Sequence, residues 1–286
     1  MSSRRAQLAE RTERQARIDA SCVETPWKER VDIPLLAMCS PLFEESSPVI
    51  LLPELRMKPM LREIVARMPH GGKIMIVDEQ NTRFEALKSC VSESNANLYF
   101  SAQEVSALNY ANDIFHGVVS EIGLATLFRL EQVVPSYRRV LRPDGLFVCC
   151  VPKSGSFSAF FDIFEECLSR LYPNLAREIC DELSTSMLPN NVIDALSESG
   201  FDVVEKSTFS VELSTFSVEL SFGSVEQLLF STIVESHFLG LCMGLRRMEI
   251  DARELLTLVV RSFHHYFQGE SPKVVIECLA VACRKI

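Results

Sequence analysis

The sequence predicts an α/β fold: a doubly wound, mostly parallel sheet with helices on both faces. Short apolar runs alternate with segments of helical apolar spacing between residues 49 and 151, which is the pattern of successive β-α-β units. The run 146–151 is continuously apolar and too short for a typical helix, as expected of a strand covered on both faces. Just before it, Pro143 and the dipeptide Asp144-Gly145 predict a turn that follows a helix.

The elements of this first part follow in a regular order. We expect strands at 49–52, 73–79, 97–100, 113–121 and 146–151. Between them, the apolar spacing predicts helices at 57–68, 83–91 and 127–141. Right-handed crossovers then place these helices on both faces of the sheet.

The second part adds further helices and the last strands. Apolar spacing predicts helices at 157–171 and 190–199. Ser224-Val-Glu-Gln227 is a capping-box pattern that opens another helix, and Asp251-Ala-Arg-Glu254 opens one that runs to about residue 267. We expect strands at 201–213 and 273–285, and the late strand makes the sheet mixed.

A tandem repeat lies in this region. The segment STFSVEL occurs at 207–213 and again at 214–220. Because seven is odd, one continuous strand would turn the two copies to opposite faces. Either both faces are covered or the strand bends near Ser214.

Composition limits the function classes. The 286 residues are 47% hydrophobic and 23% charged, as in a globular protein with a substantial core. The net charge of −9 argues against a nucleic-acid partner. We expect no membrane span, because no apolar run reaches about 18 residues. Ten cysteines without a C-x-x-C pair and five scattered histidines predict reduced thiols and no metal site.

The N-terminal part differs from the rest. Residues 1–19 are rich in arginine with acidic residues interspersed, and four prolines lie between residues 21 and 48. We expect an N-terminal helical lead-in at 1–44 and the main domain at 45–286. The interspersed acidic residues favour a cytoplasmic protein, with the mitochondrial matrix as the alternative.

The order of elements, together with one stretch of sequence, resembles a known family. The stretch SEIGLATLFRLEQVVPSYRRVLRPDGLFVCCVP, at 120–152, resembles class I S-adenosylmethionine-dependent methyltransferases. Within them it is similar to the group of the malonyl-carrier-protein O-methyltransferases and the complex I assembly arginine hydroxylase. The tail, with GFDVVEKSTFSVEL, SVEQLL, ARELLTLVVRSFHHYF and VVIECLAVACRK, is similar to the same group. The resemblance implies a seven-stranded Rossmann-like sheet with an antiparallel last strand.

The resemblance also implies a cofactor site for S-adenosylmethionine. Asp78 ends the second strand, where an acidic residue accepts hydrogen bonds from ribose hydroxyls, as in dinucleotide folds. Gln103, next to Ala102, stands where the family reads adenine, and its amide has both a donor and an acceptor. Glu54 is chemically suited to the cofactor's amino group.

The methyl acceptor would enter over the carboxyl ends of the strands, beside Ser120 and Glu121. Residues 153–190 and 224–268 are then expected to form a lid. Its candidate lining residues are Tyr172, His237, His264, His265 and Tyr266. No catalytic residue is assigned, because methyl transfer needs a base only when the acceptor must lose a proton.

One part of the family pattern is missing. After the first strand the chain reads PELRMKPMLREI in place of a glycine-rich loop, and its first glycine is Gly71. Glycines there let the backbone approach a cofactor, whereas Leu55 and Met57 bring side chains into that space.

Two hypotheses follow. The first is a methyltransferase acting on a small molecule or on a carrier-protein or protein acceptor. The alternative is a catalytically inactive methyltransferase-like protein that serves as a binding or assembly factor. An open pocket beside Asp78 would favour the first, and Leu55 or Met57 filling that space would favour the second. A nicotinamide-dependent oxidoreductase is disfavoured, because it also needs the glycine loop.

Overall fold

The structure is a computed structural model of the chain. It describes residues 13–55, 58–79, 84–91, 96–202, 212–234, 237, 250–268 and 270–286. Its centre is a mixed sheet with eight strands in these described ranges, in the order β3-β2-β1-β4-β5-β8-β6, with β7 also paired to β8. The strands are β1 Val49–Pro53, β2 Lys73–Asp78, β3 Asn97–Ala102, β4 Phe115–Glu121, β5 Leu141–Pro152, β6 Phe201–Asp202, β7 Glu212–Ser221 and β8 Lys273–Lys285.

The direction of the strands agrees with the sequence prediction. Strands β1 to β5 pair in parallel, and β8 runs antiparallel to β5, β6 and β7. The order reverses between β1 and β4, so the carboxyl ends of these two strands flank a crevice of the kind where open α/β sheets bind ligands. The predicted α/β class, the doubly wound sheet and its antiparallel last strand are confirmed.

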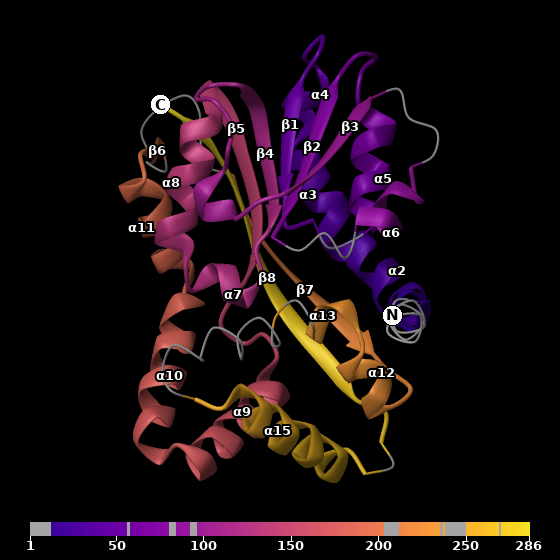
Figure 1. Cartoon of the computed structure of the whole chain (residues 1–286), viewed down its shortest axis with the longest axis vertical. Helices are drawn as coiled ribbons and strands as arrows, with labels where there is room; N and C mark the ends of the chain where they lie inside the picture. Colours follow the sequence, from indigo (N-terminus) through magenta and orange to yellow (C-terminus); the bar gives the residue numbers. More distant parts are fainter. Residues whose placement is uncertain are drawn as a thin grey trace, which may run out of the picture.

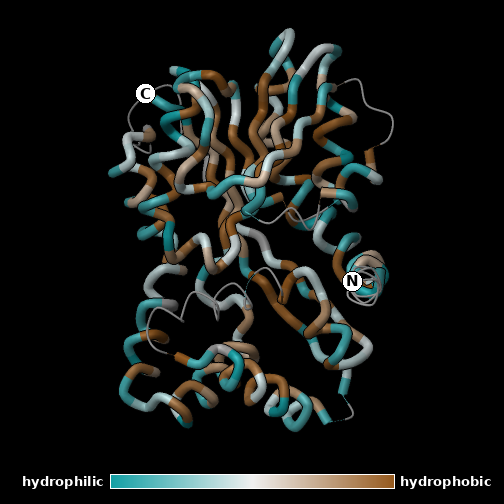
Figure 2. The backbone as a smooth tube through the Cα atoms, viewed as in Figure 1, coloured by the Kyte–Doolittle hydropathy of each residue, from teal (hydrophilic) through white to brown (hydrophobic). Residues whose placement is uncertain are grey.

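The helices divide into two groups (Figure 1). Those beside the sheet include α5 Lys58–Arg67, α6 Phe84–Lys88, α7 Leu124–Leu127, α8 Leu130–Val140 and α11 Pro189–Glu198. A second group lies below the sheet and comprises α9 Ser158–Leu171, α10 Pro173–Ser186, α12 Val225–Leu229, α13 Thr232–Val234 and α15 Ala252–Tyr266. Strands β7 and β8 run from the sheet into this lower group. Figure 2 shows hydrophobic residues along the strands and on the sides of helices.

Two predicted helix starts are formed by the expected caps. The Asp251 carboxylate accepts hydrogen bonds from the Arg253 and Glu254 amides at 2.9 and 3.2 Å. The Ser224 hydroxyl accepts one from the Gln227 amide at 3.3 Å. The Gln227 side-chain oxygen accepts a hydrogen bond from the Gly223 amide at 2.8 Å. In an ideal capping box the donor would be the amide of the cap residue itself, here Ser224.

The turn before β5 differs in detail from the prediction. The expected helix at 127–141 is two helices, because α7 ends at Leu127 and α8 begins at Leu130. Strand β5 begins at Leu141, and its register against β4 shifts across the turn. Asp144 adopts the left-handed conformation at φ 60°. Gly145 is required by close approach, since a Cβ there would lie 2.7 Å from the Arg142 carbonyl oxygen.

The tandem repeat is described only in part. Its second copy lies in β7, where Val218 and Leu220 are buried and share one face. Residues 203–211, which hold most of the first copy, lie outside the described residues. Strand β7 pairs continuously with β8 through Ser214, so there is no break at that residue.

The N-terminal segment is built into the core. It forms η1 Asp19–Val23, α2 Glu24–Trp27, η2 Lys28–Asp32, α3 Ile33–Met38 and α4 Ser40–Phe43. Val23, Val31 and Leu35 are fully buried. Leu42 of α4 packs closely over Gly117 of β4, where an added Cβ would lie 2.4 Å from a Leu42 methyl group. We call residues 19–43 the N-terminal cap.

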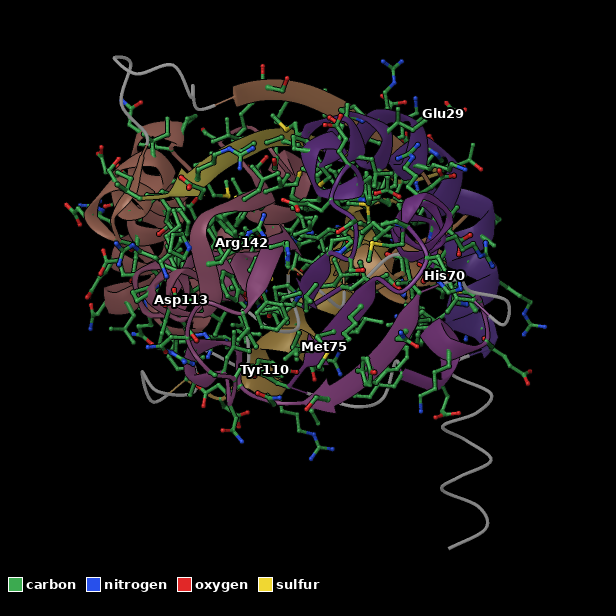
Figure 3. All side chains as sticks on the ribbon, turned by 90° about the horizontal axis from the view of Figure 1, so that it is seen from above. Glu29, His70, Met75, Tyr110, Asp113 and Arg142 are labelled. Atoms are coloured by element: carbon green, nitrogen blue, oxygen red, sulfur yellow. The ribbon has the colours of Figure 1, made fainter. Side chains whose placement is uncertain are left out.

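The amino ends of the strands are closed by ion pairs. Arg142 pairs with Glu45, and Lys285 pairs with Asp113 at 2.5 Å. Figure 3 views the molecule from this end, where Arg142 and Asp113 are labelled. Within the described ranges, no helix combines the length and apolar character needed to cross a membrane.

Candidate functional site

The five predicted cofactor residues lie at one edge of the sheet. Glu54 follows β1, Asp78 ends β2, and Ala102 ends β3 with Gln103 directly after it. Ser120 is the penultimate residue of β4. Because parallel strands share the direction of their carboxyl ends, the fold brings these residues to the edge where such sheets bind ligands.

Glu54 is held in a defined position. Its backbone is left-handed, with φ 52°, a conformation that glycine adopts most easily. Its amide donates to the Val77 carbonyl at 2.7 Å. The buried hydroxyl of Thr126, on α7, lies 2.7 Å from both carboxylate oxygens. The carboxylate is therefore fixed at the crevice between β1 and β4.

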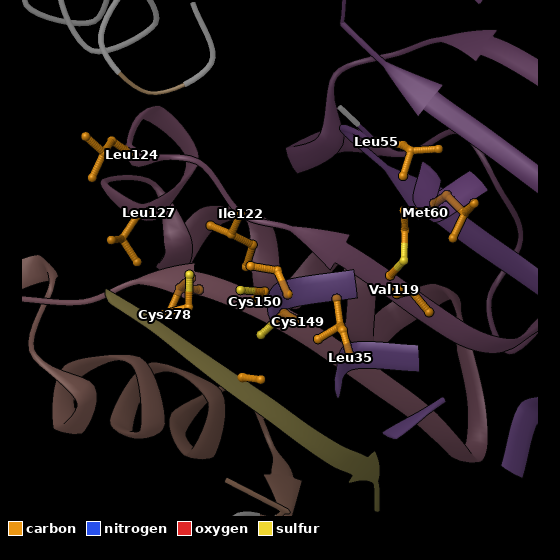
Figure 4. Close-up of a cluster of buried hydrophobic side chains, with 14 of the residues drawn as sticks. Leu35, Leu55, Met60, Val119, Ile122, Leu124, Leu127, Cys149, Cys150 and Cys278 are labelled. Atoms are coloured by element: carbon orange, nitrogen blue, oxygen red, sulfur yellow. The ribbon is translucent and has the colours of Figure 1, made fainter. Parts of the chain in front are cut away.

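The rest of the β1 turn is apolar. Leu55 is 3% exposed, and Figure 4 shows it in the same buried cluster as Met60. Pro53 is buried too, whereas Met57 lies outside the described residues. Leu55 thus contributes to the core at the point where a glycine-rich loop was missing from the sequence.

Asp78 and Gln103 are linked through the backbone. The Gln103 amide donates to the Asp78 carbonyl at 3.1 Å. The Gln103 side chain donates to the Ser101 hydroxyl at 2.8 Å and accepts from the Asn109 amide at 2.7 Å. These bonds brace the loop after β3. Burial raises the pKa of the neighbouring Tyr110 phenol.

The end of β4 borders a small cavity. Ser120 is 1% exposed, and its hydroxyl has no hydrogen-bond partner among the described residues. Next to it, the buried Glu121 accepts a hydrogen bond from the indole nitrogen of Trp27 at 3.0 Å. The cavity is lined by Trp27, Glu121, Ile122, Cys150, Val151, Pro152, Ile233, His237, Ile276 and Cys278. Water-sized groups can occupy about 20 Å³ of it.

His237 also lines this cavity. Its Nδ1 accepts a hydrogen bond from the Leu124 amide at 3.3 Å, which places the proton of the neutral ring on Nε2. The ring lies 4.8 Å from that of Phe157. Of the five predicted lid residues, His237 alone appears in the lining of this cavity.

The other four lid residues lie elsewhere. The Tyr172 hydroxyl accepts from the Asp251 amide at 2.8 Å, which joins α9 to α15. His264 lies 3.6 Å from the Glu226 carboxylate, and His265 lies 3.3 Å from the side-chain nitrogen of Gln268. The side chain of Tyr266 is 65% exposed.

The cavity also contains two thiols. A hydrogen bond with Cys278 and burial raise the pKa of Cys150 well above its usual value, so this thiol is neutral. Figure 4 shows Cys150, Cys278 and Ile122 in one apolar cluster. The described cysteines are all free, and the described residues contain no group of three or more potential ligands that would hold a metal ion.

Asp32 is the residue here that the sequence did not identify. It is fully buried in η2 of the N-terminal cap, and neither carboxylate oxygen has a hydrogen-bond partner among the described residues. Burial, and next the negative charge of Glu121, raise the pKa of Asp32 to about 8. Trp27, the single tryptophan of the chain, was missed as well. The one available signal was its place in the apolar series with Val23 and Val31.

The residues of this edge suit a sulfonium nucleoside in part. Two carboxylates, Glu54 and Asp78, lie at the carboxyl ends of β1 and β2, and carboxylates can accept hydrogen bonds from an amino group and from ribose hydroxyls. The left-handed backbone at Glu54 supplies a turn that glycine usually makes. The cavity lining does not include Asp78, however, and Leu55 occupies core space at the β1 turn.

Comparison with solved structures shows the fold. A Bacillus halodurans protein described as a methyltransferase has a TM-score of 0.53 and 12% identity, covering 88% of this chain and 98% of its own. The YcgJ protein of Bacillus subtilis has a TM-score of 0.51 and 10% identity, covering 88% of this chain and 97% of its own. The [4+2]-cyclase SpnF has a TM-score of 0.50 and 12% identity, and the match covers 91% of this chain and 82% of the cyclase. The chain has the Rossmann-like fold of class I methyltransferases.

Sequence comparison gives a more limited match. A demethylmenaquinone methyltransferase of Mycolicibacterium paratuberculosis is 30% identical over 78 residues, covering 27% of this chain. The match spans only 34% of that enzyme's length. No protein-family model matches the sequence.

Proposed function

We propose that the chain is an S-adenosylmethionine-dependent methyltransferase. The observation that carries this proposal is the convergence of three carboxylates, Glu54, Asp78 and Glu121, at the ends of β1, β2 and β4. Glu54 and Glu121 lie at the ends of the two strands between which the order reverses, and Asp78 ends the neighbouring strand; such a crevice is the usual ligand position in open α/β sheets. The methyltransferase fold and the short sequence match support the same assignment.

Each residue has a role that fits its chemistry. Glu54 would hold the amino group of the cofactor, and Asp78 would accept hydrogen bonds from the ribose hydroxyls. Ala102 and Gln103 would border the adenine, and Ser120 would lie beside the reacting end. When bound, the cofactor supplies a methyl group activated by a positively charged sulfur.

The chain's own contribution is positioning and exclusion of water. The lid would be formed by residues 153–190 and 224–268, whose described helices α9, α10, α12, α13 and α15 lie below the sheet in Figure 1. Trp27 from the cap and His237 from the lid line the same cavity as Glu121. Alignment of two reactants in such a closed site contributes strongly to the rate of a two-substrate reaction.

The alternative is a binding or assembly protein that has lost catalysis. The buried Leu55 at the β1 turn favours it, because a side chain stands where the family has glycine. The fold is compatible with either function, since a cyclase shares it. A carrier protein or an assembly partner is what the sequence resemblance suggests that the chain binds.

Calorimetric titration with S-adenosylmethionine and S-adenosylhomocysteine tests the proposal. We expect micromolar binding that Asp78→Ala abolishes and Asp194→Ala, an exposed aspartate of α11, leaves unchanged. Far-UV circular dichroism checks that both variants are folded. Absence of heat up to millimolar ligand would contradict the methyltransferase function and leave the binding protein.

A further inference from the structure

Strands β6 and β7 pair with the same strand, β8, but in different registers. Asp202 of β6 lies opposite Arg284, and Glu212 of β7 lies opposite Ala282. One residue of β8 lies between these two partners, whereas nine residues, 203–211, lie between Asp202 and Glu212. The chain that pairs with β8 therefore contains eight more residues in this interval than β8 does.

The length of this surplus matches the tandem repeat. STFSVEL occurs at 207–213 and again at 214–220, so the chain carries one extra copy of seven residues. If the chain slid along β8 by one copy, Glu205 would lie opposite Ala282. The surplus between β6 and the next paired residue would then fall to one residue, the size of an ordinary β-bulge.

Such a slide would change almost none of the side chains that face β8. Strand β7 reads ELSTFSVELS at 212–221, and the segment seven residues earlier, 205–214, reads EKSTFSVELS. Nine of the ten positions are identical, and the exception is Lys206 in the place of Leu213. The pairing with β8 therefore distinguishes the two segments at a single position.

The slide also keeps each side chain on its own face of the sheet. A one-residue shift of a strand turns every side chain to the other face, but here each position receives the same residue type. In β7, Val218 is 1% exposed and Leu220 is fully buried. Val211 and Leu213 would take these two positions, so the apolar contacts of the strand would be reproduced.

The far end of β7 would receive the surplus. There, the Phe222 amide donates to the Pro272 carbonyl at 3.0 Å, and Phe222 is 1% exposed. After the slide, Ser214 would lie opposite Lys273, and the segment 215–221 would stand between Ser214 and Phe222. The free energy of closing a loop changes slowly with its length, so it favours neither end strongly.

We propose that β7 has two registers on β8, one repeat apart, and that the extra copy of STFSVEL passes from one end of the strand to the other. The register of the structure is the major one. The minor register places Lys206 in the position of Leu213, opposite the fully buried Val281, which disfavours a charged side chain. The two registers are two states of one chain whose populations a substitution can shift.

The register sets how the lid is attached to the sheet. Three residues, 222–224, connect β7 to α12 in the major register, and ten residues, 215–224, connect them in the minor one. The next helix, α13, contributes Ile233 to the lining of the cavity at the end of β4. The device thus acts on one wall of the candidate site, and its existence does not depend on the proposed methyltransferase function.

A charge placed in either copy tests the proposal. Val218→Asp puts a carboxylate in a buried position in the major register only, and Val211→Asp does so in the minor register only. Val211→Asp alone should therefore leave urea unfolding nearly unchanged. Because Val218→Asp can change register, adding Val211→Asp to it should lower the equilibrium constant for folding by at least about tenfold further. Equal stability of Val218→Asp and the double variant would overturn the proposal.

Hydrogen exchange of the full chain locates the register directly. In the wild type, slow exchange is expected in peptides covering 214–221. In Val218→Asp, slow exchange should move to peptides covering 205–213. Loss of protection at 214–221 without a gain at 205–213 would refute a second register.

Lys206→Leu keeps the test decisive if Val218→Asp is poorly folded. This substitution makes 205–214 identical to 212–221, so it should raise the urea midpoint of Val218→Asp. Lys206→Arg, which retains the charge, is the matched control and should not raise it. If Lys206→Leu gave no more stability than Lys206→Arg in the Val218→Asp protein, the two copies would not be interchangeable and the proposal would fail.

Discussion

The turn after β1 and the end of β4 lie at the same edge of one sheet, but they differ in how their carboxylates are hydrogen-bonded. At the turn, the Glu54 carboxylate receives the hydroxyl of Thr126, and Leu55 fills the core beside it. At the end of β4, Glu121 accepts a hydrogen bond from the Trp27 indole, and both oxygens of the buried Asp32, whose pKa the charge of Glu121 helps to raise, lack a hydrogen-bond partner among the described residues.

The difference indicates where function constrains the fold. Apolar packing at a turn stabilises the protein whether or not a ligand binds. A buried carboxylate pair lowers stability, so its presence points to a use other than folding. By this criterion the end of β4 is the more specialised of the two regions, whereas the turn after β1 holds an apolar core residue, Leu55.

The largest expected effect concerns Asp32. Its pKa is about 8 in the fold and 3.8 in the unfolded chain, so the folded state binds the extra proton between these values. The stability from this group is complete below pH 4 and is lost as pH rises through 8, at up to about 1.4 kcal/mol per pH unit. Asp32→Asn should remove that slope in urea unfolding curves from pH 5 to 9. Parallel curves for the two proteins would contradict the assignment.

Trp27→Ala should have the next largest effect. Removal of a buried aromatic side chain costs about 3–5 kcal/mol, and here it also deprives Glu121 of its donor. Trp27→Phe keeps most of the packing and should cost about 1–3 kcal/mol. Urea unfolding followed by far-UV circular dichroism measures both. Equal stabilities of wild type and Trp27→Ala would show that the N-terminal cap is not part of the core.

Thr126→Val tests the hydrogen bond that holds Glu54 at the turn after β1. The substitution preserves shape but removes the hydroxyl that Glu54 accepts, and we expect a loss of about 1–3 kcal/mol. Thr126→Ser, which keeps the hydroxyl, is the control and should lose only about 1 kcal/mol for the methyl group. If the two variants were equally stable, the hydroxyl would not support the turn.

Glu54→Gln should have the smallest effect on stability. Its amide oxygen still accepts from Thr126, so the free energy of unfolding should stay within about 0.5 kcal/mol of wild type. Affinity for S-adenosylhomocysteine should nevertheless fall about tenfold, a loss of about 1.4 kcal/mol, because the negative charge for the amino group is gone. Calorimetry with unchanged affinity would exclude Glu54 from the cofactor site.

Local patterns account for what the sequence predicted correctly. Apolar runs such as 146–151 and caps such as Asp251 act within a few residues, so strands and helix starts were predictable. The sequence predicted short helical pieces in the N-terminal segment, and Pro34 and Pro41 stand in the first turns of α3 and α4, where proline fits a helix. The packing of this segment into the core depends on residues far away in the sequence and was not predictable from its local pattern.

The site was predictable only where position along a strand determines it. Glu54, Asp78, Gln103 and Ser120 lie at strand ends, and the order of strands brings them to one edge. The pairing of Asp32 with Glu121 depends on packing between segments far apart in the sequence. No local spacing encodes such a contact, and therefore neither the cavity nor its charge could be inferred beforehand.

Hydrogen exchange with and without saturating S-adenosylhomocysteine tests the central claim most directly, because it locates the cofactor on the chain. The account predicts slower exchange in peptides covering 49–55, 73–79 and 97–104, with little change in α11. Protection confined to other segments, or none at all, would contradict a cofactor site at the ends of β1, β2 and β3.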